Sequence, residues 1–439
     1  MTETILVITF DMIPYTQNWG GCQRIFFLSE FLQEKGFNVI VVHLKNNYYN
    51  MFGKNLSFST IALEIDILSK INSQINSYNS ADDTNKREVL TKFIKHNLNR
   101  FFFLIKKERY NEIDPYQGFL GELLIEKIKK NISTIIKSND IHKVIISGPP
   151  FSLFSIMKYF KENFIDLKVI LDYRDPWNLW NMGNQLSRHN EYSIIRLADH
   201  VVFVNERLRD DTIKLFNLDK NRCSVVFNGY SEKDWQEIIR DNENLSLNKR
   251  REQLIISYIG SMSFNKGGYR DLSTFLLALE KFRYKDKVRI RFVGAEASEE
   301  AEEIAKKFKN SIEFIPRVSY KRSLEYMLDS DILLLVHTDK KSAKYVVTGK
   351  FFDYARSGKI ILGISNDKDA YFMNLIERHK LGIASLNEEE QILKALNLIY
   401  YEWDNGKIDD LRKTSSQELK NFSRDNQNKE FIKILHNLG

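Results

Sequence analysis

Residues 331–365 read DILLLVHTDKKSAKYVVTGKFFDYARSGKIILGIS. The runs at 331–337 and 360–365 are short and apolar on both faces, and the residues from 348 onward have the spacing of a helix. Strands that are apolar on both faces are typical of parallel sheets covered by helices. The stretch therefore predicts a strand, a crossover helix and a second parallel strand of an α/β protein.

The same alternation extends over most of the 439 residues. We expect strands at 5–10, 38–44, 143–147, 168–173, 200–205 and 224–228 in the first half, and at 254–260, 288–294, 311–316, 331–337, 360–365 and 382–385 in the second. Helices are expected between them, including 22–36 and 270–282. A chain of this length exceeds the size at which a single core usually stops growing. The pattern predicts two doubly wound, Rossmann-like parallel sheets facing a central cleft.

The boundary between the two domains is expected in the polar, charged stretch at 241–253, which lacks apolar periodicity. We therefore expect an N-terminal domain at 1–245, a C-terminal domain at 246–410 and a helical tail at 411–439. Residues 45–117 interrupt the alternation of strands and helices, and we interpret them as an insertion.

Part of this insertion is strongly basic. Residues 86–110 contain eight Lys or Arg against two Glu, interleaved with apolar side chains. The pattern is typical of a helix that lies on an anionic membrane surface. It is equally typical of a helix whose aromatic side chains pack under the sheet. Both interpretations stay open.

Composition excludes several classes of protein. Apolar residues make up 43% and charged residues 28%, as in an ordered globular protein. No uncharged apolar stretch approaches the ~20 residues that a membrane span requires. The two cysteines, Cys22 and Cys223, lack the spacing of metal ligands, which indicates a reducing, cytoplasmic compartment. The apolar run at the N-terminus is too short for a signal peptide and is expected to be a strand.

The formal charge of +7 indicates an anionic partner, such as phosphate groups or a lipid surface, or simply a solvated surface. A nucleic-acid partner would rest on this charge alone, because the sequence holds no recognised binding module. We therefore expect no nucleic acid among the partners.

Ligands of open parallel sheets bind outside the carboxyl ends of the strands, so the residues after each apolar run are the candidates. In the first half, Gly20 and Gly21 allow the backbone to pass close to a substrate, or form a plain turn. Residues 172–177, DYRDPW, combine carboxylates, a guanidinium and an indole. They form either a polar site with an aromatic wall or a structural ion pair of Arg174 with Asp175.

Two segments of the second half are suited to an anion. Residues 260–271, GSMSFNKGGYRD, follow a strand and present Lys266 and Arg270 to a ligand such as a diphosphate. Residues 348–350 start a helix whose amides would hold phosphate, with Asp353 placed to reach sugar hydroxyls. Alternatively, this helix start is only an N-cap followed by a charged first turn.

No metal or cofactor is expected. Two D-x-D triplets occur, but the one at 329–331 precedes its strand and the one at 367–369 begins a surface helix. His337 ends a strand, where a single histidine is either a cleft residue or a structural one. No Ser-His-Asp or Cys-His set can be assembled from the sequence.

Taken together, these segments resemble the retaining GT-B glycosyltransferases of the glycosyltransferase family 4 type, many of which build bacterial surface polysaccharides. The resemblance covers nearly the whole chain. It is carried, in chain order, by Gly20 and Gly21 with Arg24, DPYQGF at 114–119, SGPPFS at 147–152, DYRDPW at 172–177, FNGY at 227–230, GSMSFNKGGYRD at 260–271 and TGKFFDYARSGKIIL at 348–362.

The resemblance implies a nucleotide-sugar donor on the C-terminal domain and an acceptor on the N-terminal domain. The catalytic residues would be Lys266 and Arg270, which stabilise the leaving diphosphate, and Asp175. The substrate-binding residues would be Gly20, Gly21, Arg24, Arg174, Ser261, Thr348, Gly349, Lys350 and Asp353, with Asp353 on the ribose. The chain departs from the family pattern at Ser261, where an arginine is frequent, and at Tyr345, where the first acid of the E-x7-E motif would fall.

We therefore expect a cytoplasmic or peripheral membrane glycosyltransferase that moves a sugar, with retention, from a nucleotide sugar to a glycan or lipid-linked acceptor in surface polysaccharide synthesis. Two alternatives remain. One is a sugar-nucleotide epimerase of the same fold, which would form product without an acceptor. The other is a non-catalytic subunit that binds a nucleotide sugar and never turns it over.

Overall fold

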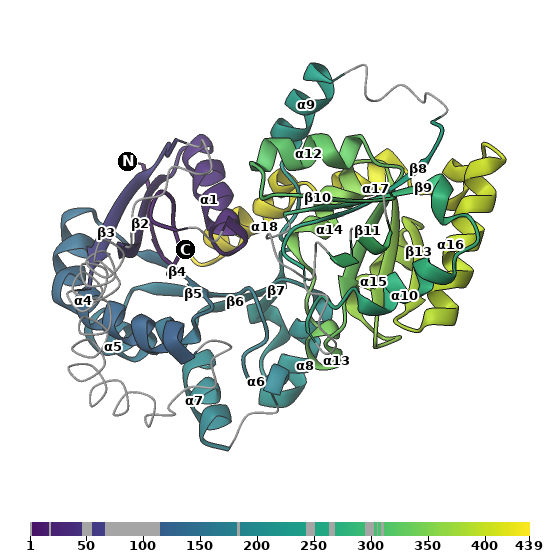
Figure 1. Cartoon of the computed structure of the whole chain (residues 1–439). Coiled ribbons are helices and arrows are strands. Elements are labelled where there is room, and N and C mark those ends of the chain that lie inside the picture. The colour runs from purple at the N-terminus through teal and green to yellow at the C-terminus, as the bar shows by residue number, and fades with distance from the viewer. Residues whose placement is uncertain are drawn as a thin grey trace, which may run out of the picture. The chain divides into compact units, whose positions relative to one another are not determined.

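The computed structural model describes residues 2–16, 19–45, 55–65, 115–181, 185–242, 251–262, 268–294, 303–304, 306–308 and 311–439. The chain divides into two compact units, of which the first comprises Met1–Val226 with Glu430–Gly439 and the second Phe227–Lys429. Each unit is built on one parallel sheet flanked by helices, which confirms the predicted α/β class with two doubly wound sheets (Figure 1).

The sheet of the first unit has seven strands in the order β3-β2-β1-β4-β5-β6-β7. Its strands are β1 (Thr4–Ile8), β2 (Asn38–Lys45), β3 (Ser59–Glu64), β4 (Lys143–Gly148), β5 (Lys168–Tyr173), β6 (His200–Phe203) and β7 (Cys223–Val225). β3 lies inside the segment interpreted as an insertion, and it pairs with β2 in parallel. Sequence reasoning missed β3 because it is an edge strand whose residues are only half-buried or exposed, so its apolar signal is weak.

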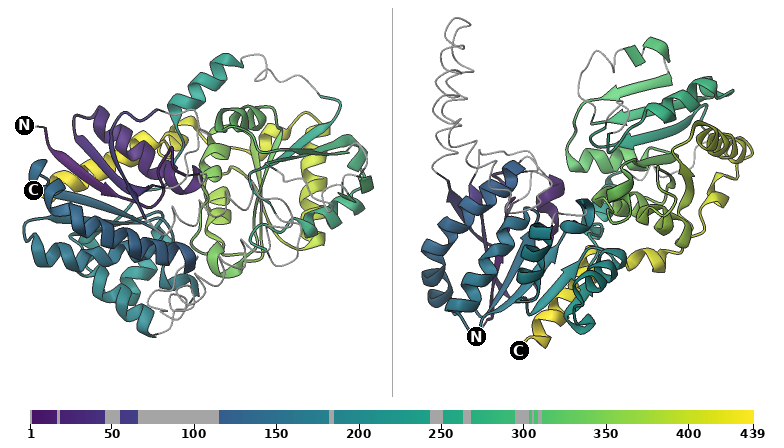
Figure 2. Two further views of the ribbon diagram at one scale, coloured as in Figure 1. Left: turned by 60° about the vertical axis from the view of Figure 1, so that its left-hand side comes forward. Right: turned by 90° about the horizontal axis from the view of Figure 1, so that it is seen from below.

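Helices of the first unit are α1 (Trp19–Glu34), α4 (Pro115–Ser138), α5 (Ile156–Asn163), α6 (Asn178–Asn181), α7 (Gln185–Ile195), α8 (Glu206–Phe216) and the end of α18 (Arg424–Asn437). One face of the sheet packs against α1 and α18 (Figure 2). There Val7 of β1 and Val41 of β2 share a buried cluster with Phe26 of α1 and Phe431 of α18. The first and last segments of the chain therefore form one core.

The sheet of the second unit has six strands in the order β10-β9-β8-β11-β12-β13. They are β8 (Leu254–Ile259), β9 (Val288–Val293), β10 (Ile312–Ile315), β11 (Ile332–His337), β12 (Ile360–Ser365) and β13 (Gly382–Leu386). On β11, Ile332 and Leu334 face one buried cluster, and Leu333 and Leu335 face the other. Burial on both faces explains why this strand reads as a continuous apolar run.

Each face of the second sheet has its own helices. α10 (Ser273–Lys281) and α16 (Glu389–Asp404) contribute to one buried cluster. α9 (Glu232–Asp241), α12 (Tyr320–Leu328), α14 (Gly349–Arg356) and α15 (Tyr371–Arg378) contribute to the other. The short helices α13 (Lys340–Ala343) and α17 (Ser416–Lys420) complete this unit.

The division into units differs from the predicted ranges 1–245, 246–410 and 411–439. The first boundary falls earlier, because Trp235 and Ile238 of α9 are buried in the core of the second unit. The tail is not a separate element, because Phe431 and Leu435 of α18 are buried in the core of the first unit. Neither packing partner is near in sequence, so the local polarity at 241–253 was a poor guide to the boundary.

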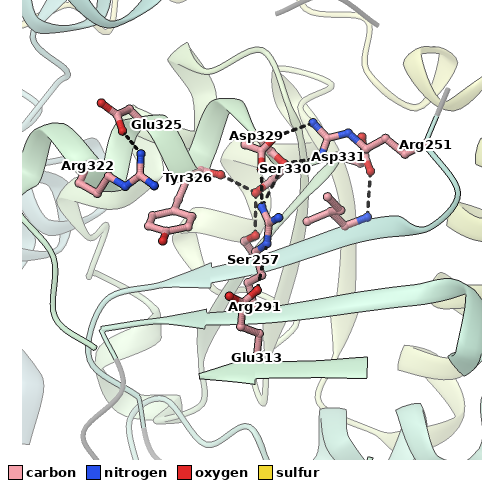
Figure 3. Close-up of polar contacts among 11 residues, drawn as sticks. Arg251, Ser257, Arg291, Glu313, Arg322, Glu325, Tyr326, Asp329, Ser330 and Asp331 are labelled. Carbon is pink, nitrogen blue, oxygen red and sulfur yellow. Dashed lines mark hydrogen bonds and ion pairs between the residues drawn. The ribbon is translucent and has the colours of Figure 1, made fainter. Parts of the chain in front are cut away.

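A polar network orders the amino-terminal ends of β8 and β11 (Figure 3). The carboxylate of Asp329 accepts hydrogen bonds from Arg251 Nη2 at 2.8 Å and from Arg291 Nη1 at 2.6 Å. Asp331 Oδ2 accepts from the backbone N–H of Ile255 at 2.8 Å. Both carboxylates of the D-x-D triplet at 329–331 therefore have protein partners that join neighbouring strands.

Candidate functional site

Three segments of the second unit meet beyond the carboxyl ends of its central strands. Gly260 directly follows β8 and has a φ of +119°, a conformation that favours glycine. A Cβ atom at this position would lie 2.9 Å from Nζ of Lys350, the second residue of α14. The absence of a side chain at Gly260 thus lets the lysine reach the end of β8.

The ammonium of Lys350 occupies an unusual position for a cation. Its Nζ lies 4.2 Å from the ring centroid of Tyr258, which is fully buried. Burial and, to a smaller extent, the charge of Arg270 lower the pKa of Lys350 well below its usual value. No described residue forms an ion pair with Lys350, and a cation–π contact compensates only part of the desolvation. An anion bound here would supply the missing charge.

Arg270 is the second cation of the cluster. Its Nη1 donates to the carbonyl oxygen of Ser261 at 3.3 Å and to the hydroxyl of the same residue. Within the part of the chain that the structure describes, Arg270 also has no ion-pair partner. The structure thus brings together Ser261, Arg270 and Lys350, three residues that the sequence predicted for a donor site.

Two buried polar atoms at the same strand ends lack hydrogen-bond partners among the described residues, namely Nδ1 of His337 and Oγ1 of Thr348. Nε2 of His337 lies 2.7 Å from the hydroxyl of Ser342. Burial, followed by the charge of Arg270, lowers the pKa of His337 to about 4, so the ring is neutral at neutral pH. Buried polar atoms normally have partners, so both atoms are available to a ligand or to water. This places His337 beside the cations.

Thr348 and Gly349 form the start of α14, as predicted. Thr348 is the N-cap residue, but its side chain makes no capping hydrogen bond. The alternative interpretation of this threonine as a capping side chain therefore has no support in the geometry. Amides in the first turn of a helix carry partial positive charge, and those of α14 lie next to Lys350 in the chain.

Asp353 has partners on the other side of α14. Its Oδ1 accepts hydrogen bonds from Trp235 Nε1 at 3.1 Å and from the hydroxyl of Tyr320 at 3.0 Å. Burial raises the pKa of Asp353 to about 6, against the lowering effect of Arg424. The carboxylate therefore connects α9, α12 and α14, and its contact with a ribose stays a prediction. Lys266 lies outside the described residues.

In the first unit, Arg24 of α1 is taken up by a buried network. Its Nη2 lies 2.8 Å from Oδ1 of Asp172, and its Nη1 donates to the carbonyl oxygen of Val226 at 2.8 Å. The hydroxyl of Ser147 donates to Oδ2 of the same aspartate at 2.7 Å. These contacts hold α1, β4, β5 and the end of β7 together, and a substrate contact of Arg24 stays a prediction.

Arg174 connects the first turn of α1 with the end of β4 and the residue that follows it. Its guanidinium donates to the carbonyl oxygens of Gly21, Gly148 and Pro149. Gly20 and Gly21 lie in the first turn of α1, which begins at Trp19, earlier than predicted. The side chain therefore shapes the backbone at the carboxyl edge of this sheet.

Two carboxyl groups with raised pKa values lie beyond β5, of which Glu191 is buried and Asp175 is partly buried. Burial raises the pKa of Asp175 to about 6, and the adjacent Arg174 opposes this shift. Burial also raises the pKa of Glu191 to about 7, although Nδ2 of Asn178 donates to it at 2.6 Å. Sequence reasoning missed Glu191, because nothing distinguishes a glutamate within an ordinary amphipathic segment such as α7. Raised pKa values of this kind are frequent in functional sites.

The described ranges contain no group of three His, Cys, Asp or Glu side chains placed to hold a metal ion. In the same ranges, no helix is both long enough and apolar enough to cross a membrane. Cys22 and Cys223 are buried thiols. What the second unit does offer is fixed positive charge, helix amides and unpartnered polar atoms, which is a suitable set for a phosphate-bearing ligand.

Comparison with known proteins agrees with this geometry at the level of the fold. Neither a family model nor a curated protein matches the sequence. A glycosyltransferase from Rickettsia africae ESF-5 has a similar structure, with a TM-score of 0.62 and 13% identity over 100% of this chain and 98% of that one. HepE from Anabaena, solved in complex with UDP-glucose, has a TM-score of 0.61 and 11% identity over 99% of both chains.

The apo form of the lipopolysaccharide outer core galactosyltransferase WaaB also has a TM-score of 0.61, with 11% identity over 99% of both chains. Structural likeness at such low identity establishes the fold alone. The chain therefore has the GT-B fold, built here on a seven-stranded and a six-stranded parallel sheet.

Proposed function

We propose that the protein is a glycosyltransferase whose donor is a nucleotide-diphosphate sugar. The diphosphate would lie against Arg270, Lys350 and the first turn of α14. One observation carries this assignment: two neighbouring cations, both partly buried, have no ion-pair partner among the described residues. The likeness to HepE, which is solved with UDP and with UDP-glucose, supports a donor of this class.

The chemistry follows from the charges. When the bond from the sugar to the diphosphate breaks, negative charge accumulates on the departing phosphate while the sugar carbon becomes cationic. Arg270 and Lys350 stabilise that negative charge at fixed positions, which lowers the barrier more than it strengthens ground-state binding. Lys266 would add a third cation to this group.

The acceptor would bind to the first unit, beyond β1 and β5, where Gly20, Gly21, Arg174 and Asp175 lie. Asp175 has a pKa close to neutrality and is suited to exchange a proton with an acceptor hydroxyl. We propose a reaction with retention, in which the departing phosphate can itself take the acceptor proton. Asp175 would then orient the acceptor.

The acceptor proposed here is a glycan or a lipid-linked glycan in surface polysaccharide synthesis. A lipid-linked acceptor requires the enzyme to work at the inner face of the cell membrane. The basic segment at 86–110, which lies outside the described residues, is the proposed contact. Replacement of its six basic residues by Gln should abolish sedimentation with anionic vesicles and leave nucleotide binding intact. These residues are at positions 92, 95, 100, 106, 107 and 109.

A panel of UDP-, GDP-, ADP- and CMP-sugars in a thermal-shift assay tests the donor class, because only a ligand of the native state raises the midpoint. The sugar nucleotide that binds is then incubated with and without oligosaccharide acceptors. Transfer that requires the acceptor supports a glycosyltransferase. Isomerised donor without acceptor would indicate an epimerase, and binding without any turnover a non-catalytic subunit.

Arg270→Ala tests whether nucleotide binding depends on this arginine or only on the overall positive charge of the protein. Removal of a charged hydrogen bond worth about 1.5–3 kcal/mol should weaken nucleotide binding roughly tenfold or more. Arg283→Ala removes the same charge at an exposed position of the same unit and is the matched control. Equal affinity of the Arg270 variant and the control would contradict the assignment.

A further inference from the structure

Arg270 belongs to a short backbone segment that is attached to the end of β11 by three hydrogen bonds. All three involve Thr338, the residue that follows this strand. Its backbone N–H donates to the carbonyl oxygen of Tyr269 at 2.9 Å, and its hydroxyl donates to the carbonyl oxygen of Gly268. The same hydroxyl accepts a hydrogen bond from the N–H of Asp271 at 3.2 Å.

These contacts fix the backbone on both sides of Arg270 in the sequence. The residues before it and the residue after it are all held by one threonine, which is only 4% exposed. A hydroxyl is the one small side-chain group that can donate and accept at the same point. Thr338 thereby sets the direction in which the arginine leaves the backbone, and the guanidinium reaches Ser261 at the end of β8.

Thr338 is itself anchored to the neighbouring strands. Nδ2 of Asn366, which follows β12, donates to the carbonyl oxygen of Thr338 at 2.6 Å. Nδ2 of Asn387, which follows β13, donates to Oδ1 of Asn366 at 2.9 Å. A continuous series of hydrogen bonds therefore runs along the carboxyl edge of the sheet to the segment that carries Arg270.

We infer that Thr338 is a positioning residue, which pre-orients Arg270 for the diphosphate of the donor; this rests on the proposed function. A long side chain that is free before binding loses conformational freedom when it contacts a ligand. A backbone fixed on both sides of the arginine reduces that loss and keeps the guanidinium beside Ser261 and Lys350. The threonine reaches the ligand only through the arginine.

The experiment compares Thr338→Val, which removes the hydroxyl but keeps the shape, with Thr338→Ser, which keeps the hydroxyl. Affinities for UDP and for inorganic pyrophosphate are measured by calorimetry. Thr338→Val should weaken both roughly fivefold or more, as is usual for coupled neighbours, and Thr338→Ser should stay close to wild type. Thr212→Val, a buried threonine in α8 of the first unit, is the control for loss of a buried hydroxyl.

A double variant tests whether Thr338 acts through Arg270. In the Arg270→Ala background, Thr338→Val should cause little further loss of affinity, because the side chain that it orients is gone. Melting temperatures of all variants show whether the second unit stays folded. If the valine variant does not fold, the comparison of the serine variant with wild type decides the case.

The two hypotheses fail in different ways. If the wild type binds neither probe, or if Arg270→Ala binds both as tightly as wild type, the proposed diphosphate site is wrong. If Arg270→Ala loses affinity while Thr338→Val keeps it, or if the two losses add fully, the site stands and the positioning role of Thr338 is wrong. If Thr338→Ser loses as much as a folded Thr338→Val, the hydroxyl is not the cause.

Discussion

In each unit, one candidate site residue has an ionised form that its surroundings disfavour. Lys350 is a partly buried cation whose ammonium lies over the ring of Tyr258. Asp175 is a carboxyl group whose pKa burial has raised towards neutrality. Groups that would be more stable in their neutral form are retained where a ligand or a reaction needs the charge.

Lys350→Met should affect binding and stability in opposite directions. The methionine keeps an apolar chain over Tyr258 and removes a partly buried charge without an ion-pair partner among the described residues, so the melting temperature should not fall. Nucleotide affinity should decrease roughly tenfold or more, since a charge-assisted contact to phosphate is lost. Calorimetry and thermal unfolding measure the two effects, and Lys344→Met, at an exposed position, is the control. A variant that binds normally would remove Lys350 from the site.

Asp175→Asn should stabilise the protein at neutral pH. The folded-state pKa of about 6 lies above the ordinary value of 3.8, so the stability contributed by this group is full below about pH 4 and is lost as the pH rises through 6. At pH 7–8 the unfolding free energy of the variant should therefore exceed that of wild type by up to about 3 kcal/mol. Near pH 4 the two unfolding free energies should be equal. Asp166→Asn, at an exposed position, should show no such trend.

The same variant tests the catalytic role of Asp175. If the ionised carboxylate orients or deprotonates the acceptor, kcat/KM of the wild type should fall as the pH drops through about 6, and Asp175→Asn should lose most activity. A variant that is more stable and fully active would show that Asp175 is structural.

At the scale of elements, α14 makes two sets of contacts on different faces. Its first turn and Lys350 face the end of β8, while Asp353 faces α9 and α12 through Trp235 and Tyr320. A helix of eight residues is too short to be stable alone, so this joint holds its first turn in place.

Two substitutions separate the roles of this helix. Asp353→Asn keeps an oxygen for Trp235 and Tyr320 but removes the charge. Because burial raises the pKa of this carboxyl to about 6, the melting temperature at pH 7–8 should rise, as for Asp175→Asn, while nucleotide affinity falls roughly tenfold. Trp235→Phe removes the indole donor, which should cost about 1–3 kcal/mol of stability and leave affinity for nucleotide nearly unchanged. If Asp353→Asn binds nucleotide as wild type does, the role of Asp353 is only to connect the helices.

The helices and strands themselves follow from local patterns. The strands at 168–173 and 360–365 begin and end where the apolar runs predicted. β3 was missed, and α1 begins before its predicted start, because an edge strand and a helix start that contains two glycines have weak local signals.

At the scale of the whole molecule, the chain passes from the first unit to the second and returns for its last ten residues. Phe431, Ile434 and Leu435 belong to the core of a sheet whose strands come from the N-terminal half of the sequence. The first unit therefore depends on the C-terminus for its stability.

Phe431→Ala should destabilise the first unit selectively. Truncation of a fully buried phenylalanine typically costs 3–5 kcal/mol, because the transfer free energy is lost and a cavity remains. Hydrogen exchange should accelerate in β1 and β2 far more than in β8 and β11, and nucleotide binding by the second unit should persist. Uniform acceleration in both sheets would show that the units unfold as one.

The sequence by itself determined the two parallel sheets, all of their strands except β3, and the set of cations and glycines at the carboxyl ends. Those features depend on periodicity and on residue type, which are local. Only the tertiary structure decided that Lys350 reaches Gly260, that Arg24 is paired with Asp172, that Asp353 is held by Trp235, and that the tail completes the first unit. Each of these contacts joins residues far apart in the chain, and their energies arise from burial and hydrogen bonding that exist only once the sheets and helices have packed.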